Sequence, residues 1–188
     1  MGHIGHFVLN WTKCQNPDDF SALSTMFDTL VDLLQSQGAR FRVLEHPAEG
    51  RSDLVAEIRG TAPGQGAKAM LCKSRDAAGA GDPQLFLAVL PGDRKLDFKR
   101  LAQAVGVRKA TLASPEEAQA ATGCVMGSVP PFSFNPQVRL VVDPALVERF
   151  GEIAFNAGRL DRSIVLDSAD YVRIARPALH SLSGEGAD

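Results

Sequence analysis

The sequence predicts a mixed α/β fold, a single compact domain in which short helices flank a curved, partly barrel-like mixed β-sheet. Short apolar stretches typical of strands alternate with stretches of helical periodicity, but without the regular period of a doubly wound sheet. The chain has 188 residues, of which 45% are hydrophobic and 22% are charged, so it is long enough to bury one sizeable core.

A helix is expected near the N-terminus. Apolar residues recur at helical spacing between Phe20 and Leu34, Asn16 is suited to cap the helix, and Gly38 ends the pattern. Residues 1–40 are therefore expected to form an N-terminal extension whose amphipathic helix packs on the core.

Strands and a short helix are predicted next. The segment FRVLEH is typical of a strand, and SDLVAEIRG is typical of a helix that ends at Gly60. The segments KAMLCK and QLFLAVLP predict two strands that pair across the flexible connection SRDAAGAGDP. The unbroken apolar run of the second strand indicates that both of its faces are covered.

The second half predicts two capped helices followed by strands and short helices. DFKRLAQAVG begins with the cap Asp97, and SPEEAQAATG has a capping box formed by Ser114 and Glu117. QVRLVV and EIAFNAG predict strands on either side of the short helix DPALVERFG, and SIVLDSADYVRIA predicts a strand followed by a helix. Residues 179–188 are expected to be a disordered tail.

The composition excludes several classes of protein. A net charge of −2 gives no general attraction for nucleic acid, so no DNA partner is expected. The chain has neither a long apolar run nor a secretory signal, which predicts a cytoplasmic protein without a membrane partner. Three distant cysteines do not suit a disulfide framework or a zinc site, and His3 and His6 lack further ligands nearby. We expect neither a metal nor a cofactor.

The glycine-rich segment GTAPGQGAK does not fit a nucleotide-binding loop. Ala67 separates Gly66 from Lys68, whereas a phosphate loop needs adjacent Gly and Lys, and the dinucleotide fingerprint lacks its third glycine. Lys68 still stands out, because it begins an apolar strand after a turn that lets a ligand approach the backbone closely. The alternative is a lysine at a strand edge that reaches water.

The loop GCVMGSVPPFSFNP is stiff, apolar and uncharged. Pro130 and Pro131 fix their own φ angles, so the loop is suited to present the backbone N–H groups of Gly127 and Ser128 to a carboxyl-like oxygen. Its apolar side chains would then wall off a small pocket. The alternative is a buried crossover between two parts of the sheet.

Basic residues bracket the helix that begins at Asp97. Such a group is usually a solvated face, but here it is also the best candidate for a phosphate-binding patch. The candidates for this patch are Lys95, Lys99, Arg100, Arg108 and Lys109.

Several of these segments resemble one family. TGCVMGSVPPFSF is similar to the Gly-x-x-x-Pro motif of the YbaK-like family, with Gly127 and Pro131 at its ends. This family includes the editing domain of bacterial prolyl-tRNA synthetases and its free-standing trans-editing relatives. GAKAMLCK resembles the segment that carries the functional lysine of the family, here Lys68. EHPAEG, LDFKRLAQAVGVRKATLASPEEAQAATG and FNAGRLDRSIVLDSAD match in type and order, which assigns residues 41–178 to this domain.

The resemblance implies an aminoacyl-tRNA deacylase. It would hydrolyse the ester of a small wrong amino acid, such as alanine, cysteine or 2-aminobutyrate, on a tRNA for proline, with water and no covalent protein nucleophile. Because a synthetase pocket separates amino acids that differ by one methylene by only ~1–3 kcal/mol, such errors need a second, size-limited site. The partners implied are misacylated tRNA, which the basic patch around the helix at Asp97 would bind, and prolyl-tRNA synthetase. The alternative is a non-catalytic module that binds a tRNA end or a small ligand.

The resemblance also distributes roles within the site. Lys68 would hold the terminal adenosine, and the amides of Gly127 and Ser128 would support the oxyanion. Asp143 matches a family aspartate near the pocket, although its position also suits a helix cap. The residues expected to line the pocket are Val125, Met126, Val129, Pro130, Pro131, Phe132, His46 and Asp143.

Overall fold

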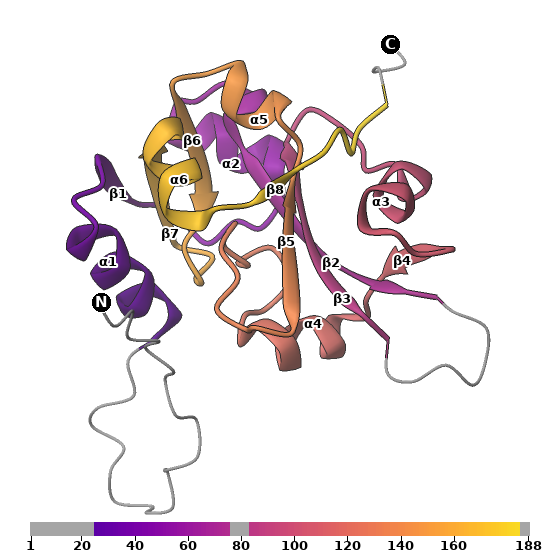
Figure 1. Cartoon of the computed structure of the whole chain (residues 1–188). Coiled ribbons are helices and arrows are strands. Elements are labelled where there is room, and N and C mark those ends of the chain that lie inside the picture. Colours follow the sequence, from indigo (N-terminus) through magenta and orange to yellow (C-terminus); the bar gives the residue numbers. More distant parts are fainter. Residues whose placement is uncertain (1–24, 76–82, 185–188) are drawn as a thin grey trace, which may run out of the picture.

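Two β-sheets form the centre of the computed structural model, which describes residues 25–75 and 83–184 (Figure 1). The first has three strands in the order β1-β7-β6, and the second has five in the order β4-β2-β3-β5-β8. A parallel bridge between Gly66 and Ala154 connects the two sheets. The predicted mixed α/β class is confirmed, but the partly barrel-like shape is not, because neither sheet closes on itself.

The strands follow the predicted segments closely. The predicted pairing of KAMLCK with QLFLAVLP is confirmed, since β2 and β3 are antiparallel with Lys68 opposite Leu90. The short strands β4 and β8 were not predicted. The strands are β1 (Phe41–Glu45), β2 (Ala67–Ser74), β3 (Leu85–Pro91), β4 (Ala110–Leu112), β5 (Val138–Val142), β6 (Glu152–Asn156), β7 (Arg162–Asp167) and β8 (Ala178–Leu179).

Four of the helices, α1, α3, α4 and α6, begin at side chains that accept hydrogen bonds from free backbone N–H groups. Asp97 caps the helix after it, and Ser114 and Glu117 form the predicted capping box. The first helix begins at Met26 behind a capping box at Thr25, not near Asn16 as predicted, and residues 1–24 lie outside the described residues. The helices are α1 (Met26–Ser36), α2 (Ser52–Arg59), η1 (Pro63–Gln65), α3 (Phe98–Val105), α4 (Pro115–Thr122), α5 (Ala145–Glu148) and α6 (Ser168–Ala175).

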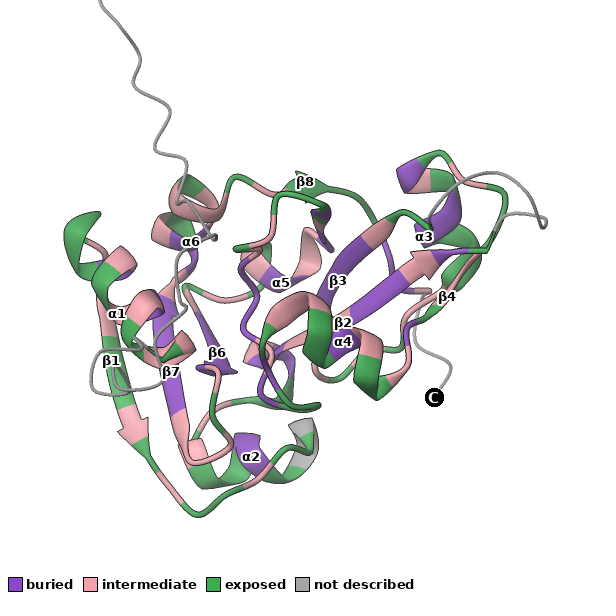
Figure 2. Ribbon diagram, turned by 90° about the horizontal axis from the view of Figure 1, so that it is seen from below, coloured by how far each residue is buried: buried purple, intermediate pink, exposed green. Residues whose placement is uncertain are grey.

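The main core lies between the two sheets, whose strands β2, β3, β6 and β7 are largely buried (Figure 2). Leu30 and Leu34 of α1 are fully buried in this core. A second core lies between the five-stranded sheet and α3, where Phe86 packs near Leu101. Burial on both faces explains the unbroken apolar run of β3. Within the described residues, no helix is long and apolar enough to cross a membrane.

The chain after α6 is ordered as far as residue 184. It forms β8, which pairs with β5, and then crosses towards α3 as the yellow segment of Figure 1. The prediction of a disordered tail is therefore wrong for residues 179–184, and residues 185–188 lie outside the described residues. We call residues 178–184 the C-terminal strap. Asp97 N donates to Leu182 O at 2.8 Å, which ties the strap to the start of α3.

Candidate active site

The proline-containing loop turns at Gly127, which has a φ of 85°. A Cβ atom at this position would lie 2.9 Å from Gly50 Cα and 3.0 Å from Gly50 O. Both the backbone angle and the close approach require glycine here. The loop between β1 and α2 and the Gly127 turn are therefore in direct backbone contact.

One side-chain amide holds these two loops together. Asn156 Nδ2 donates to Glu49 O at 2.8 Å and to Gly127 O at 2.9 Å. Its Oδ1 accepts from Arg59 Nη2 at 2.7 Å and from Ser163 Oγ at 3.0 Å. Because both partners of Nδ2 are carbonyl oxygens, the orientation of the amide is fixed, and its two N–H groups are fully used. We call Asn156, Arg59, Ser163 and His46 the Asn156 cluster.

The other members of the cluster support the amide from behind. Arg59 Nε donates to Ser163 Oγ at 2.8 Å, and burial lowers the pKa of Arg59 to about 10, so the guanidinium stays charged at neutral pH. His46, predicted to line the pocket, lies in this cluster, with Nε2 2.6 Å from Ser163 Oγ. Sequence reasoning missed Asn156 and Arg59, because nothing local in FNAG or EIRG indicates contact with residue 127.

The two predicted oxyanion donors differ. Ser128 N donates to Val125 O at 3.0 Å, and its hydroxyl donates to the same oxygen at 2.9 Å. The N–H of Ser128 is therefore already occupied, and its side chain is fully buried. Within residues 25–75 and 83–184, no hydrogen bond uses the N–H groups of Gly127 or Val129.

The apolar side chains of the loop divide into exposed and buried ones. Val125 and Met126 are 48% and 58% exposed, and Val129 is half-buried. Pro130 and Pro131 are buried. The first three are available to contact a ligand, whereas the two prolines fix the backbone from inside.

Phe132 was predicted to line the pocket. In the structure it belongs to the core instead. Its ring packs against Phe155 and Tyr171, with ring centroids 6.0 Å and 5.2 Å away. Tyr171 Oη donates to Pro131 O at 2.7 Å, which anchors the loop from the α6 side.

Lys68 is the second residue of β2 and pairs with Leu90 of β3, whereas β4 pairs with β2 only at Cys72–Ser74. Its half-buried ammonium donates to Arg94 O, and to Gly92 O at 3.5 Å, in the turn between β3 and α3. Burial lowers the pKa of Lys68 and the neighbouring Lys95 lowers it further, whereas Asp93 raises it. Lys68 is therefore not a solvated edge residue.

The connection between the sheets brings Lys68 and the Asn156 cluster to one place. Gly66 and Ala154 pair in parallel, and Lys68 and Asn156 each follow that pair by two residues. Adjacent strands lie about 4.8 Å apart, so the start of β2 and the end of β6 are neighbours at this junction. The junction thus contains the lysine of one motif and the amide that holds Gly127 of the other.

Asp143 is not part of this junction. It is buried, and its carboxylate accepts from Leu182 N at 3.0 Å, Ser183 N at 2.9 Å and Ser183 Oγ at 2.7 Å. It also accepts at 3.0 Å from the N–H of Ala145, the first residue of α5, although the cap position of that helix is Pro144. The prediction that Asp143 lines the pocket is wrong, because its acceptor sites are used to hold the C-terminal strap.

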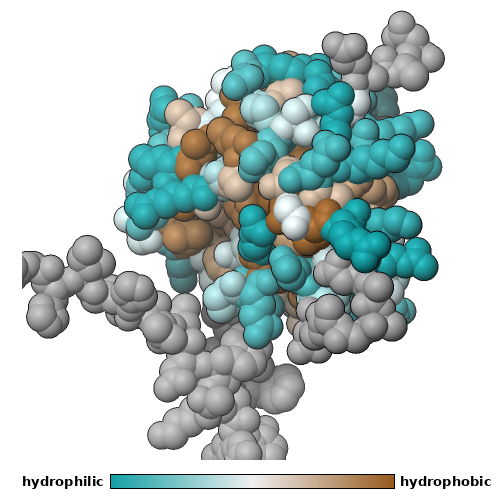
Figure 3. All heavy atoms as spheres, turned by 45° about the vertical axis from the view of Figure 1, so that its right-hand side comes forward, coloured by the Kyte–Doolittle hydropathy of each residue, from teal (hydrophilic) through white to brown (hydrophobic). Residues whose placement is uncertain are grey.

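The predicted tRNA-binding residues lie together around α3, on the side that comes forward in Figure 3, where hydrophilic side chains surround hydrophobic patches. All five side chains are exposed, and they lie in α3 and in the turns before and after it. The residues are Lys95, Lys99, Arg100, Arg108 and Lys109.

The described cysteines are free and buried, and neither is suited to act as a nucleophile. Burial raises the pKa of Cys72 to about 12 and also raises that of Cys124. Among the described residues, no group of three or more His, Cys, Asp or Glu side chains could hold a metal ion.

Comparison with known proteins gives consistent results. Residues 46–174 match the family described as the aminoacyl-tRNA editing domain. The Multifunctional Ser/Thr-tRNA deacylase ProXp-y of Escherichia coli K12 is 53% identical over 156 residues, which cover 83% of this chain and 92% of the relative. The same protein of Escherichia coli O157:H7 matches equally well.

Solved structures share the fold at lower sequence identity. The crystal structure of the hypothetical protein APE2540 has a TM-score of 0.72 at 22% identity, covering 82% of this chain and 99% of that one. A structure provisionally assigned as a trans-editing enzyme for prolyl-tRNA synthetase has a TM-score of 0.71 at 22% identity, covering 87% of this chain and 100% of that one. The matched segment contains Lys68, the Gly127 turn and the Asn156 cluster. The chain therefore belongs to the aminoacyl-tRNA editing domain family.

Proposed function

We propose that this protein removes wrongly attached amino acids from tRNA by hydrolysing the aminoacyl ester, acting in trans as a free-standing deacylase. The observation that carries the proposal is the junction of the two sheets, where half-buried Lys68 and Asn156, whose amide holds Gly127, each follow the bridged pair of Gly66 and Ala154 by two residues. Seryl-tRNA and threonyl-tRNA are the first substrates to test, because a relative with 53% identity is named for them. The amino acids suggested by the family resemblance, such as alanine and cysteine, come second.

The residues at the junction support hydrolysis by water. Water attacks the ester carbonyl carbon, the carbonyl oxygen becomes an oxyanion, and the bond to the ribose oxygen breaks as that oxygen takes up a proton. The free N–H of Gly127 is suited to stabilise the oxyanion, with Val129 N–H as a second donor, whereas Ser128 N–H is already bonded to Val125 O. Lys68 would hold the terminal adenosine or its phosphate.

Discrimination by size would come from the loop that carries Gly127. Val125 and Met126 are exposed there. The buried Pro130 and Pro131 fix the backbone of the loop, so the space next to these two side chains cannot expand easily. A small acyl group would enter this space and a bulky one would not. We assign this activity to an editing domain of residues 41–178. α1 of the N-terminal extension packs on this domain, and the C-terminal strap continues the chain from residue 178 to residue 184.

Two further assignments depend on the family resemblance. We propose that the protein works in the cytoplasm, where tRNA is charged, and that prolyl-tRNA synthetase is a partner. Co-purification of the two proteins tests the second assignment.

A panel of charged tRNAs tests the deacylase. We would measure release of serine, threonine, alanine, cysteine and proline from their tRNAs by catalytic amounts of protein. Lys68→Ala is expected to lower kcat/KM by about 100-fold, because an oriented charged contact to the substrate is lost. Lys73→Ala is the matched control from the same strand, since Lys73 pairs with Glu117 at 2.5 Å.

Two outcomes would contradict the proposal. Activity of Lys68→Ala close to that of the wild type would remove the lysine from the mechanism. Stoichiometric protection of the ester without turnover would favour the alternative function, a module that binds the tRNA end.

A further inference from the structure

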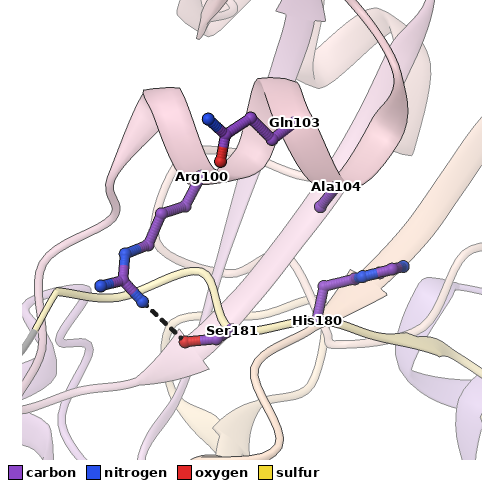
Figure 4. Close-up of a pocket in the computed structure, with 5 residues that line it drawn as sticks. All are labelled: Arg100, Gln103, Ala104, His180 and Ser181. Atoms are coloured by element: carbon purple, nitrogen blue, oxygen red, sulfur yellow. Dashed lines mark hydrogen bonds between the residues drawn. The ribbon is translucent and has the colours of Figure 1, made fainter.

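A shallow polar pocket lies between α3 and the C-terminal strap, outside the junction described above. Its volume is about 550 Å³, and Arg100 reaches from α3 to donate to Ser181 Oγ at 3.1 Å (Figure 4). Its five lining residues are Arg100, Gln103 and Ala104 of α3, and His180 and Ser181 of the strap. Four of these five carry a hydrogen-bond donor, and none of the five is acidic.

The charge around the pocket is opposite to that of the whole protein. Residues 94–109 contain six of the 20 basic residues and one of the 22 acidic ones, so this stretch carries +5 while the chain carries −2. The single acid, Asp97, caps α3 through Oδ1, which accepts from Lys99 N and Arg100 N, and its Oδ2 lies 3.8 Å from Arg100 Nε. The pocket therefore lies in a locally positive field on a weakly acidic protein.

The strap wall of the pocket is held in place by the fold. Asp143 binds the backbone N–H groups of Leu182 and Ser183 directly after the lining residues, and Leu182 is buried against the α3 core. Arg94 Nη1 also donates to Ser183 Oγ at 3.2 Å. The strap is thus a fixed wall and not a loose end that happens to lie near α3.

The pocket is connected to the candidate active site through one turn. Lys68 donates to the carbonyl oxygens of Gly92 and Arg94, and the same turn leads to Asp97, the cap of α3, two residues after Lys95. The basic residues of α3 and its flanking turns therefore follow directly along the chain from the carbonyl groups that Lys68 binds.

We propose that this pocket binds the phosphate backbone of the tRNA acceptor region, with Arg100 and Ser181 at one end of the pocket and His180, whose ring points away from them in Figure 4, at the other. This proposal depends on the proposed function, which makes tRNA the substrate. Several cations around one helix suit the evenly spaced charges of a nucleic-acid backbone, and Arg with hydroxyl and imidazole donors suits a phosphate group. An acidic protein segment is the competing ligand that the experiment must exclude.

The test measures binding of uncharged tRNA by fluorescence anisotropy over a range of salt concentrations. Arg100→Gln is expected to weaken binding roughly 3- to 10-fold and to lower the slope of log K against log[salt] by about 1, as for one lost phosphate contact. His180→Gln is a second variant, with a smaller loss in the same direction. Arg42→Gln is the matched control, because Arg42 is an exposed arginine on the other sheet that pairs with Glu152 at 2.6 Å.

The outcomes separate this inference from the proposed function. If the wild type deacylates tRNA but Arg100→Gln and His180→Gln keep the wild-type affinity and salt slope, the pocket is not a phosphate site. If the wild type binds uncharged tRNA in this Arg100-dependent way but hydrolyses no ester, the pocket stands and the deacylase fails. If polyglutamate displaces tRNA at equal charge concentration and loses affinity with Arg100→Gln while tRNA does not, the ligand is an acidic protein and the proposal is overturned.

Discussion

Two buried polar side chains hold distant loops in this protein, Asn156 at the end of β6 and Asp143 at the end of β5. They are 6% and 1% exposed, and each makes four hydrogen bonds. Asn156 donates two and accepts two, and one of its partners is Gly127. Asp143 only accepts, and three of its four bonds come from the C-terminal strap.

The difference in charge between these residues fits the loops that they hold. An anion is stable at position 143 because every group that faces it is a donor. At position 156 the side chain must donate to two carbonyl oxygens, which a carboxylate cannot do. A carboxylate there would also place negative charge one hydrogen bond from Gly127, whose N–H we propose to face an oxyanion. Burial alone therefore does not identify a functional residue. What distinguishes Asn156 from Asp143 is the loop that each side chain holds.

The largest expected effect in this comparison is on stability. Asp143→Ala leaves the buried N–H groups of Leu182 and Ser183 without an acceptor, and we expect the free energy of unfolding to fall by about 3 kcal/mol or more. Urea unfolding measures this change. Because the strap forms a wall of the α3 pocket, affinity for uncharged tRNA should fall as well.

Asp167→Ala is the control for the Asp143 variant. Asp167 caps α6 by accepting from Ala169 N and Asp170 N but is only partly buried, so its loss should cost about 1 kcal/mol. An equal loss in both variants would mean that Asp143 acts as an ordinary helix cap and does not hold the strap.

The second effect is on catalysis. Asn156→Asp removes the donors that hold the loops of Glu49 and Gly127, and we expect kcat/KM for seryl-tRNA to fall by about 10- to 100-fold. Asn156 touches no substrate in this proposal, so it is a positioning residue, and the loss should lie mainly in kcat. Single-turnover deacylation at saturating protein separates kcat from KM.

Asn135→Asp is the matched control for the amide. Asn135 lies in the same long loop as Gly127, and its Nδ2 donates to Ala121 O of α4 at 3.1 Å. Among the described residues, no hydrogen bond joins Asn135 to Gly127. It should change kcat/KM by less than about threefold. A similar fall in both variants would indicate general loosening of the loop and not a specific role of Asn156.

Local features of the fold were predictable from the sequence, whereas the long-range contacts of Asn156 and Asp143 were not. Segments with local signals, such as the capping box of Ser114 and the paired strands β2 and β3, were predicted correctly because their periodicity and caps lie within a few residues. The long-range contacts of Asn156 with Gly127 and of Asp143 with Ser183 join residues that no local pattern connects.

The candidate site was predictable only in part for a related reason. The family motifs indicated Lys68 and Gly127, but the apolar character of Phe132 fits a pocket wall and a core residue equally well. Contact with Tyr171 and Phe155, far along the chain, decides for the core. The hydrogen bond that occupies Ser128 N–H is a property of the turn and not of its composition.

The smallest expected effect is on acid stability. Burial by itself would raise the pKa of Asp143, but the hydrogen bonds from Ser183, Ala145 and Leu182 outweigh it and hold the pKa below the usual 3.8. A carboxyl whose pKa is lowered by folding stabilises the protein above its unfolded pKa, and this contribution is lost as the pH falls through the folded pKa. Asp143→Asn should therefore flatten the decline of unfolding free energy below about pH 4, by at most about 1.4 kcal/mol per pH unit.

Urea unfolding of the wild type and the variant between pH 2 and pH 6 measures this difference. Asp161 and Asp170, whose pKa values are lowered to about 2, contribute equally to the pH dependence of both proteins, so the difference between the two curves reports on Asp143. Parallel curves over that range would contradict the assignment of an ionised, strap-holding carboxylate at position 143.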